Sequence, residues 1–149
     1  MPIKLPISKE ESYVIYEGKY WTVVLHKFNQ SYLGRCIVYL HSREIANPLQ
    51  LTREEQDEFW FDIVPKLAGA LDQAFHPDRL NYSHLANEWH HVHWHIVPRY
   101  EKNPVREFAG EHFVDEKVGH NYRGMPDKLV PDEVLQLIQE EIQKHWDKQ

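Results

Sequence analysis

The sequence predicts an α+β domain built on an antiparallel sheet. Five β-prone runs lie on either side of one long amphipathic segment, three before it and two after it. This order lacks the βαβ alternation that is typical of a parallel sheet. A second helical segment lies close to the C-terminus. We therefore expect strands and helices in separate blocks, with the strands paired antiparallel.

The first three runs precede the long helical segment. Residues 13–16 and 20–26 are rich in β-branched and aromatic side chains and are separated by the turn signal at Gly18. This pattern predicts a hairpin. Residues 35–41 follow Gly34 and have an apolar centre, which predicts a third strand.

The long segment predicts a helix over about 52–75. Thr52 and Glu55 have the spacing of a capping box, in which each side chain bonds the other residue's backbone N–H. Apolar residues then recur at helical spacing, at Phe59, Ile63, Leu67, Ala70 and Ala74. Pro65 is expected to kink or break the helix, because proline has no N–H to donate.

The C-terminal third contains a final helix and a stretch without a recognisable pattern. Residues 131–146 carry one apolar stripe, which predicts a packed helix. Residues 101–128 show no clear period, and long segments of this kind are often functional or interfacial. We expect one domain over 1–149, with a core at about 12–100 and a C-terminal extension over 101–149.

Composition excludes several classes of protein. The net charge of −6 and the absence of a Lys/Arg block argue against nucleic-acid binding. No apolar run approaches the ~20 residues of a membrane span, and residues 1–10 form an irregular leader without the apolar core of a signal peptide. The single cysteine, Cys36, rules out an internal disulfide and fits a reducing compartment. We expect a cytoplasmic protein without nucleic-acid or membrane partners.

The most informative stretch is a row of histidines. His91, His93 and His95 alternate with β-branched and aromatic residues, which predicts a strand over 90–97. Side chains two residues apart share one face of a strand, so the three imidazoles would point the same way. Pro98 is expected to end the ladder of this strand.

Two chemistries use such a row. Neutral imidazole is a ligand for zinc, copper or iron. Alternatively, a neutral imidazole attacks phosphorus, its neighbours stabilise the developing charge, and the covalent phosphoramidate is later hydrolysed. The histidines alone leave both open.

The surrounding residues resemble a known family. The sequence His91-Val-His-Trp-His-Ile-Val97, followed by Pro-Arg, resembles the signature of the histidine triad (HIT) family. Asn81-Tyr82 and Leu85-Ala-Asn87 upstream are similar to a bacterial branch that resembles diadenosine-polyphosphate hydrolases. The resemblance covers about residues 12–100. It implies a HIT-like fold of five antiparallel strands, a central helix and a C-terminal helix, usually paired into a homodimer.

The resemblance also implies roles for the three histidines. His93 would be the nucleophile that attacks the α-phosphorus of a nucleoside phosphate ester, anhydride or amidate, and water would then release a nucleoside monophosphate. A backbone carbonyl near His91 would accept a hydrogen bond from the other ring nitrogen of His93 and so fix its tautomer. His95 would bind the phosphate, and its protonated form would stabilise the transition state. His91 would orient the other two.

Four further residues are candidates for substrate binding. Asn87 falls where the family carries an amide that donates to the phosphate, and an amide donates without titrating. Asn81 is a second amide candidate, and His26 lies near the family's ribose-binding position. Arg35 stands where the family often has histidine, and it could bind a phosphate bidentately.

Two residues depart from the family, and they keep alternative functions open. Glu88 and Trp89 stand where many members have Ser or Thr, and a carboxylate facing a phosphate would repel it. We expect a hydrolase of dinucleoside polyphosphates or phosphoramidates that needs no metal for the nucleophilic step, although a divalent metal could accompany the substrate phosphates. The alternatives are a nucleotide-binding HIT module with weak or no turnover, and a three-histidine metal protein. Arg99 is expected to be a structural or dimer residue.

Overall fold

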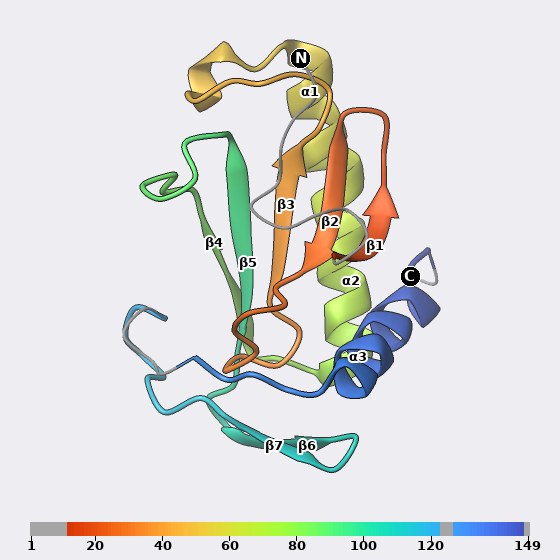
Figure 1. Ribbon diagram of the computed structural model, residues 1–149, viewed down its shortest axis with the longest axis vertical. Coiled ribbons are helices and arrows are strands. Elements are labelled where there is room, and N and C mark those ends of the chain that lie inside the picture. Colours follow the sequence, from red (N-terminus) through yellow and green to blue (C-terminus); the bar gives the residue numbers. More distant parts are fainter. Residues whose placement is uncertain (1–11, 123–126, 148–149) are drawn as a thin grey trace.

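The computed structural model describes residues 12–122 and 127–147, so the expected leader at 1–10 lies outside the described residues. It confirms the α+β class. Its main sheet has five antiparallel strands in the order β1-β2-β3-β5-β4 (Figure 1). Their bounds are Tyr13–Glu17 for β1, Trp21–Leu25 for β2, Cys36–Leu40 for β3, Arg79–Ser83 for β4 and His93–Arg99 for β5. The expected hairpin is β1 paired with β2.

The central helix is continuous but not uniform. It runs as α1 over Arg53–Glu58, a π-helical turn over Phe59–Ile63 and α2 over Val64–Phe75. Thr52 and Glu55 form the expected capping box, with hydrogen bonds of 3.1 and 2.7 Å. Pro65 was expected to kink or break the helix, and the irregularity instead takes the form of the π turn just before it. Proline lacks the N–H that continues the α-helical pattern, and a π turn re-routes the bonding through Val64 N–H to the carbonyl of Phe59.

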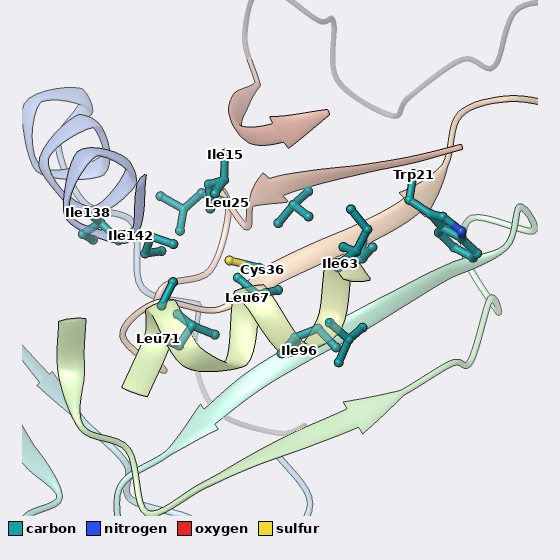
Figure 2. Close-up of a cluster of buried hydrophobic side chains, with 14 of the residues drawn as sticks. Ile15, Trp21, Leu25, Cys36, Ile63, Leu67, Leu71, Ile96, Ile138 and Ile142 are labelled. Atoms are coloured by element: carbon teal, nitrogen blue, oxygen red, sulfur yellow. The ribbon is translucent and has the colours of Figure 1, made fainter. Parts of the chain in front are cut away.

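The hydrophobic core lies between one face of the sheet and the helices α2 and α3. The last helix, α3, spans Asp132–Lys144 and buries the expected stripe of Val134, Leu135, Ile138 and Ile142. Figure 2 shows side chains of the sheet, such as Ile15 and Ile96, meeting Leu67 and Leu71 of α2 and Ile138 of α3. The helices therefore cover one face and leave the other to different residues.

The strand register decides which residues take the opposite face. Thr22, Tyr39 and His93 are directly paired across β2, β3 and β5, and Val24, Ile37 and His95 form the next row of that kind. Paired residues share a face, and these rows alternate with core residues such as Val38. His93 and His95 therefore point away from the core, as the alternation predicted.

The strand of the histidines differs from its expected bounds. It begins at His93 rather than residue 90, because Val92 exchanges backbone hydrogen bonds with Ile45 and Leu40 outside the ladder. It also continues through Pro98, which was expected to end it. The partner strand β3 pairs with β5 only as far as Ile96, so Pro98 has a neighbouring strand on one side only, where proline is tolerated.

A second, small sheet lies in the segment that showed no period. Residues Val105–Phe108 form β6 and Glu111–Val114 form β7, paired as a hairpin. Ala109 and Gly110 join them with φ angles of 51° and 80°, the positive values that a tight hairpin turn requires. Both strands have only four residues, and Phe113 is the one fully buried residue among them, so no alternation marks them in the sequence. Across the described ranges, no helix is long and apolar enough to cross a membrane.

Candidate active site

A cavity of about 420 Å³ lies on the sheet face that carries His93 and His95. Arg35, Ile37, His93 and His95 line its floor. One wall follows β2 and consists of residues 24–29, here called the β2 wall. The other follows β4 and consists of residues 85–89, here called the loop wall. The two walls come from opposite sides of the β3–β5 pair in the strand order.

His93 has the tautomer that a nucleophile needs. Its Nδ1–H donates to the backbone carbonyl of His91 at 2.7 Å, since a carbonyl can only accept. The lone pair is therefore on Nε2. Burial lowers the pKa of His93, against a smaller opposing effect of this hydrogen bond. The ring is consequently neutral at pH 7, with Nε2 unprotonated, and the expected carbonyl near His91 is the one that holds it.

His91 lies behind the cavity and does not line it. Its Nδ1 accepts from the N–H of Ile45 at 3.3 Å, so Nε2 carries the proton and donates to the carbonyl of Leu40. Both ring nitrogens are thus engaged by the backbone of neighbouring segments. This arrangement fixes the carbonyl of His91 that orients His93, and it leaves no nitrogen of His91 for a metal ion.

His95 and Arg35 act as a pair. Nη2 of Arg35 donates to Nδ1 of His95 at 3.2 Å, because arginine has no acceptor. His95 therefore carries its proton on Nε2 and is a neutral donor in this arrangement. The positive charge expected from a protonated His95 is supplied instead by Arg35, which is buried and whose guanidinium lies 4.9 Å from the ring centre of Tyr122.

His26 contributes a second neutral imidazole to the cavity. Its Nδ1 accepts from the N–H of Asn29 at 3.1 Å, which leaves the proton on Nε2. Burial, followed by the charge of Arg35, lowers the pKa of His26 to about 3. Its ring centre lies 5.8 Å from that of His95. His26 thus lines the β2 wall as an uncharged donor, close to the floor.

The loop wall brings Asn87, Glu88 and Trp89 to the same cavity. The ring of Trp89 packs against His93 with centres 4.7 Å apart and also contacts His91 and Tyr39. The sequence identified Trp89 only as a departure from the family pattern and missed this contact, since a loop has no period that fixes where a side chain points. Phe28, which lines the other wall and is 48% exposed, was also missed, although an aromatic residue in a polar connection is a usable signal.

Among the four substrate-binding candidates, Asn81 is the one that the structure separates from the others. It does not line the cavity, and its side-chain oxygen accepts from Nη1 of Arg99 at 2.9 Å. Arg99 also binds Asp115 at 2.8 and 3.1 Å and two backbone carbonyls, those of Lys117 and His120. Arg99 is almost fully buried and therefore has the structural role that was expected for it.

The remaining alternative for the histidine row is a metal centre. Within residues 12–122 and 127–147, no three His, Cys, Asp or Glu side chains come together as metal ligands do. The backbone contacts of His91 give the physical reason for this particular row. The arrangement instead offers one unprotonated nitrogen, several neutral donors and one fixed cation around a cavity, which suits a phosphate group.

Known proteins share the sequence pattern and the fold of this chain. A family model described as the HIT domain matches residues 8–102. No curated protein matches the chain. Among solved structures, a histidine triad protein from Sinorhizobium meliloti 1021 is 17% identical, covers 92% of this chain and 91% of its own, and has a TM-score of 0.72.

Two further solved structures have the same fold. A histidine triad protein from Marinobacter aquaeolei VT8 is 17% identical over 93% of this chain and 91% of its own, with a TM-score of 0.72. A hypothetical histidine triad nucleotide-binding protein from Sulfolobus tokodaii is 21% identical over 91% of this chain and 83% of its own, with a TM-score of 0.66. At these identities the likeness shows the fold, while the family model covers most of the chain. The chain therefore belongs to the histidine triad family.

Proposed function

We propose that this protein hydrolyses nucleoside phosphate conjugates at the α-phosphate through a nucleotidyl intermediate on His93. The observation that carries the proposal is the hydrogen bond from Nδ1 of His93 to the carbonyl of His91, which leaves an unprotonated Nε2 on a residue that lines the cavity. A nucleophile of this kind needs no adjacent base, because its attacking nitrogen has no proton to lose.

The floor supplies what the transition state requires. Nε2 of His93 forms a bond to the α-phosphorus while the bond to the leaving group breaks, and negative charge gathers on the phosphoryl oxygens. We propose that the guanidinium of Arg35, Nε2–H of His95 and the amide of Asn87, which all belong to residues lining the cavity, donate to these oxygens. Water then attacks the phosphorus, restores His93 and releases the nucleoside monophosphate. Each well-placed donor of this kind typically contributes about 10²-fold or more in rate.

The β2 wall suits the nucleoside. Val24 and Phe28 of this wall, with Ile37 of the adjoining floor, offer apolar surface for a base, and Nε2–H of His26 offers a neutral donor for a sugar hydroxyl or the base. Two finer parts of the proposal rest only on the sequence resemblance. They are a likeness to diadenosine-polyphosphate hydrolases and adenine as the base. The substrate classes to compare are thus dinucleoside polyphosphates and nucleoside phosphoramidates.

The test is turnover of diadenosine tri- and tetraphosphate and an adenosine phosphoramidate by wild type and His93→Ala. His112→Ala, which removes an exposed histidine of β7 that does not line the cavity, is the matched control. We expect AMP release by wild type and control only, and an adenylyl adduct that requires His93 on protein denatured at alkaline pH, where a P–N bond to imidazole survives. Equal turnover by wild type and His93→Ala would mean that His93 is not the nucleophile.

A second candidate is a nucleotide-binding module with weak or no turnover. Trp89 packs against the ring of His93, and the negatively charged Glu88 lines the cavity, both of which would oppose attack on a phosphate. Clear AMP binding by wild type, with no turnover of any conjugate, would favour this candidate.

The proposed reaction needs no cofactor for the nucleophilic step, and a divalent metal would enter only with the substrate phosphates. A cytoplasmic location is part of the proposal, supported by the buried free thiol of Cys36. Adding EDTA to the assay tests whether turnover needs a divalent metal. Turnover of a phosphoramidate, which has no polyphosphate chain, should persist.

We also propose that two copies form a homodimer. β4 is the last strand of the sheet, and Trp60, Phe61 and Tyr82 are 45%, 80% and 45% exposed, which is unusual for large apolar residues. Sedimentation velocity should give a dimer for wild type and a monomer for Phe61→Glu or Tyr82→Glu. Leu49→Glu, at another exposed apolar residue, is the control and should remain dimeric.

A further inference from the structure

We propose that Glu88 selects the leaving group by charge, favouring conjugates whose leaving group carries a cation over those that leave a polyphosphate. The inference rests on the proposed function, since it concerns the substrate of the same site. It assigns a purpose to the residue that departs most clearly from the family pattern.

The charges around the cavity are unevenly placed. Four charged side chains of the described residues line it: Lys27, Arg35, Glu88 and Asp127. Arg35 lies in the floor and is bound to His95, so it belongs with the α-phosphate. Lys27 is part of the β2 wall, and Asp127 accepts a hydrogen bond from Asn29 of that wall. Glu88 is thus the one charged residue among those lining the loop wall.

Glu88 is available to a ligand. Its side chain is exposed, and no lysine, arginine or histidine of the described part of the chain forms an ion pair with it. Trp89 beside it is held in place by its contacts with His93 and Tyr39. An exposed carboxylate and an indole in the same cavity wall favour an ammonium group, through charge attraction and a cation–π contact.

The position of Glu88 relative to the reacting phosphorus decides which part of the substrate it meets. The apolar surface and the neutral donors for the nucleoside lie in the β2 wall, on one side of the β3–β5 floor. The leaving group then extends along the loop wall. A polyphosphate would bring several negative charges next to the carboxylate of Glu88, whereas an ammonium group there would be attracted to it.

An amidate with a remote ammonium group fits these requirements. Nε2 of His93 forms the N–P bond, and the P–N bond of the substrate breaks with its electron pair on the amine nitrogen, which takes one proton from solvent. Water then attacks the phosphorus, the bond to His93 breaks with its pair on Nε2, and one proton returns to solvent. The net reaction is amidate plus water giving nucleoside monophosphate plus amine.

The test uses three adenosine 5′-phosphoramidates whose leaving amines have nearly the same length: 1,4-diaminobutane, n-pentylamine and 4-aminobutyrate. Their free ends are an ammonium, a methyl and a carboxylate group. For wild type we expect kcat/KM to fall in that order, by about tenfold from first to last, and the difference to shrink with added salt because Glu88 is exposed. Ratios within one variant cancel any general loss of activity.

Three variants make the result specific. Glu88→Gln should bring the three substrates to within about twofold of one another, and Glu88→Lys should reverse their order. Glu140→Gln removes the same charge from an exposed position on α3, which covers the other face of the sheet, and should keep the wild-type order. Equal kcat/KM for the three substrates in wild type, or an unchanged order in Glu88→Gln, would overturn the proposal.

Binding measurements test the charge selection by Glu88 independently of the proposed hydrolysis. Dissociation constants of the same three compounds for His93→Ala do not depend on turnover. Suppose that wild type hydrolyses none of the three compounds, that His93→Ala binds them in the expected order, and that adding Glu88→Gln removes this order. The proposed charge selection would then be supported and the proposed hydrolysis would be wrong. If binding also ignores the charge, charge selection falls as well.

Discussion

Arg35 and His95, 60 positions apart in the sequence, are joined by a hydrogen bond of 3.2 Å from Nη2 to Nδ1. Arg35 directly precedes β3, and His95 lies within β5. Because arginine stays protonated across the physiological range, the bond keeps His95 in one tautomer and keeps one positive charge in the floor at any working pH. A histidine in place of Arg35 would not give this independence from pH.

Replacing Arg35 should therefore damage catalysis more than binding of the nucleoside. We expect Arg35→Gln to lower kcat by about 10²-fold, because both a charge at the phosphate and the anchor of His95 are lost. In ¹⁵N NMR spectra, His95 should change from a pure Nε2–H tautomer to a mixture. Arg53→Gln, on the exposed side of α1, is the control. A normal kcat with a mixed tautomer would separate the anchor from catalysis.

His26 should make the fold sensitive to acid. The unfolded chain protonates this residue below pH 6.5, whereas the folded protein does so only near its pKa of about 3. The free energy of unfolding therefore falls as the pH drops through this window, by about 1.4 kcal/mol per pH unit for this one group. Stability from this residue is complete above pH 6.5.

Urea denaturation of wild type and His26→Gln at pH 7.5 and pH 5 tests this effect. The loss of stability between the two values should be smaller in the variant by about 2 kcal/mol. The same loss in both proteins would show that His26 is protonated in the folded state well above pH 3.

The buried pair of Arg99 and Asp115 should be costly to break from one side. Asp115→Asn leaves a guanidinium that is 2% exposed without its counter-charge, and such losses cost about 3–5 kcal/mol. The exposed pair of Arg79 and Glu101 is the matched control, and Glu101→Gln should cost less than about 1 kcal/mol. Chemical denaturation measures both, and equal small losses would contradict the assigned role of Arg99.

Substitutions at two glycines should distinguish the cost of backbone strain from the cost of steric crowding. Gly34 has a φ angle of 90°, and a Cβ atom there would lie 3.0 Å from Phe75 and 3.1 Å from Leu71. Gly110 has a φ angle of 80° with nothing within 4 Å of such an atom. Gly110→Ala should cost about 1 kcal/mol through strain alone, and Gly34→Ala about 1–3 kcal/mol more. Thermal denaturation of the two variants would contradict this if the melting temperatures fell equally.

The sequence predicted the sheet, the helices and the shared face of His93 and His95, because alternation along a strand fixes the face without reference to any partner. It could not predict where β5 begins. That limit depends on backbone bonds from Val92 to Ile45 and Leu40, about 50 positions earlier in the chain. The tautomer of His93 was expected through family resemblance, and its hydrogen bond was found where the resemblance placed it.

Other parts of the site could not be predicted from patterns in the sequence. Asn81 has a side chain that could bind a substrate, but in the structure this side chain is bound to Arg99. No local feature of the sequence predicts that contact. The contact of Trp89 with His93 likewise depends on how a loop folds back over a strand. The hairpin of β6 and β7 has strands of four residues each, which is too short to produce a period in the sequence.

The loop wall has no regular secondary structure, whereas His93 and His95 lie on a strand in the interior of the sheet. Of the loop wall, Asn87 and Trp89 belong with the proposed reactive centre, whereas residues 85, 86 and 88 do not contact His93 in this way. Substitutions at residues 85, 86 and 88 can therefore change the chemical preference without disturbing the strand that holds His93. For protein engineering, the same division means that a library confined to these three positions would sample new leaving groups while His93, Asn87 and Trp89 stay in place.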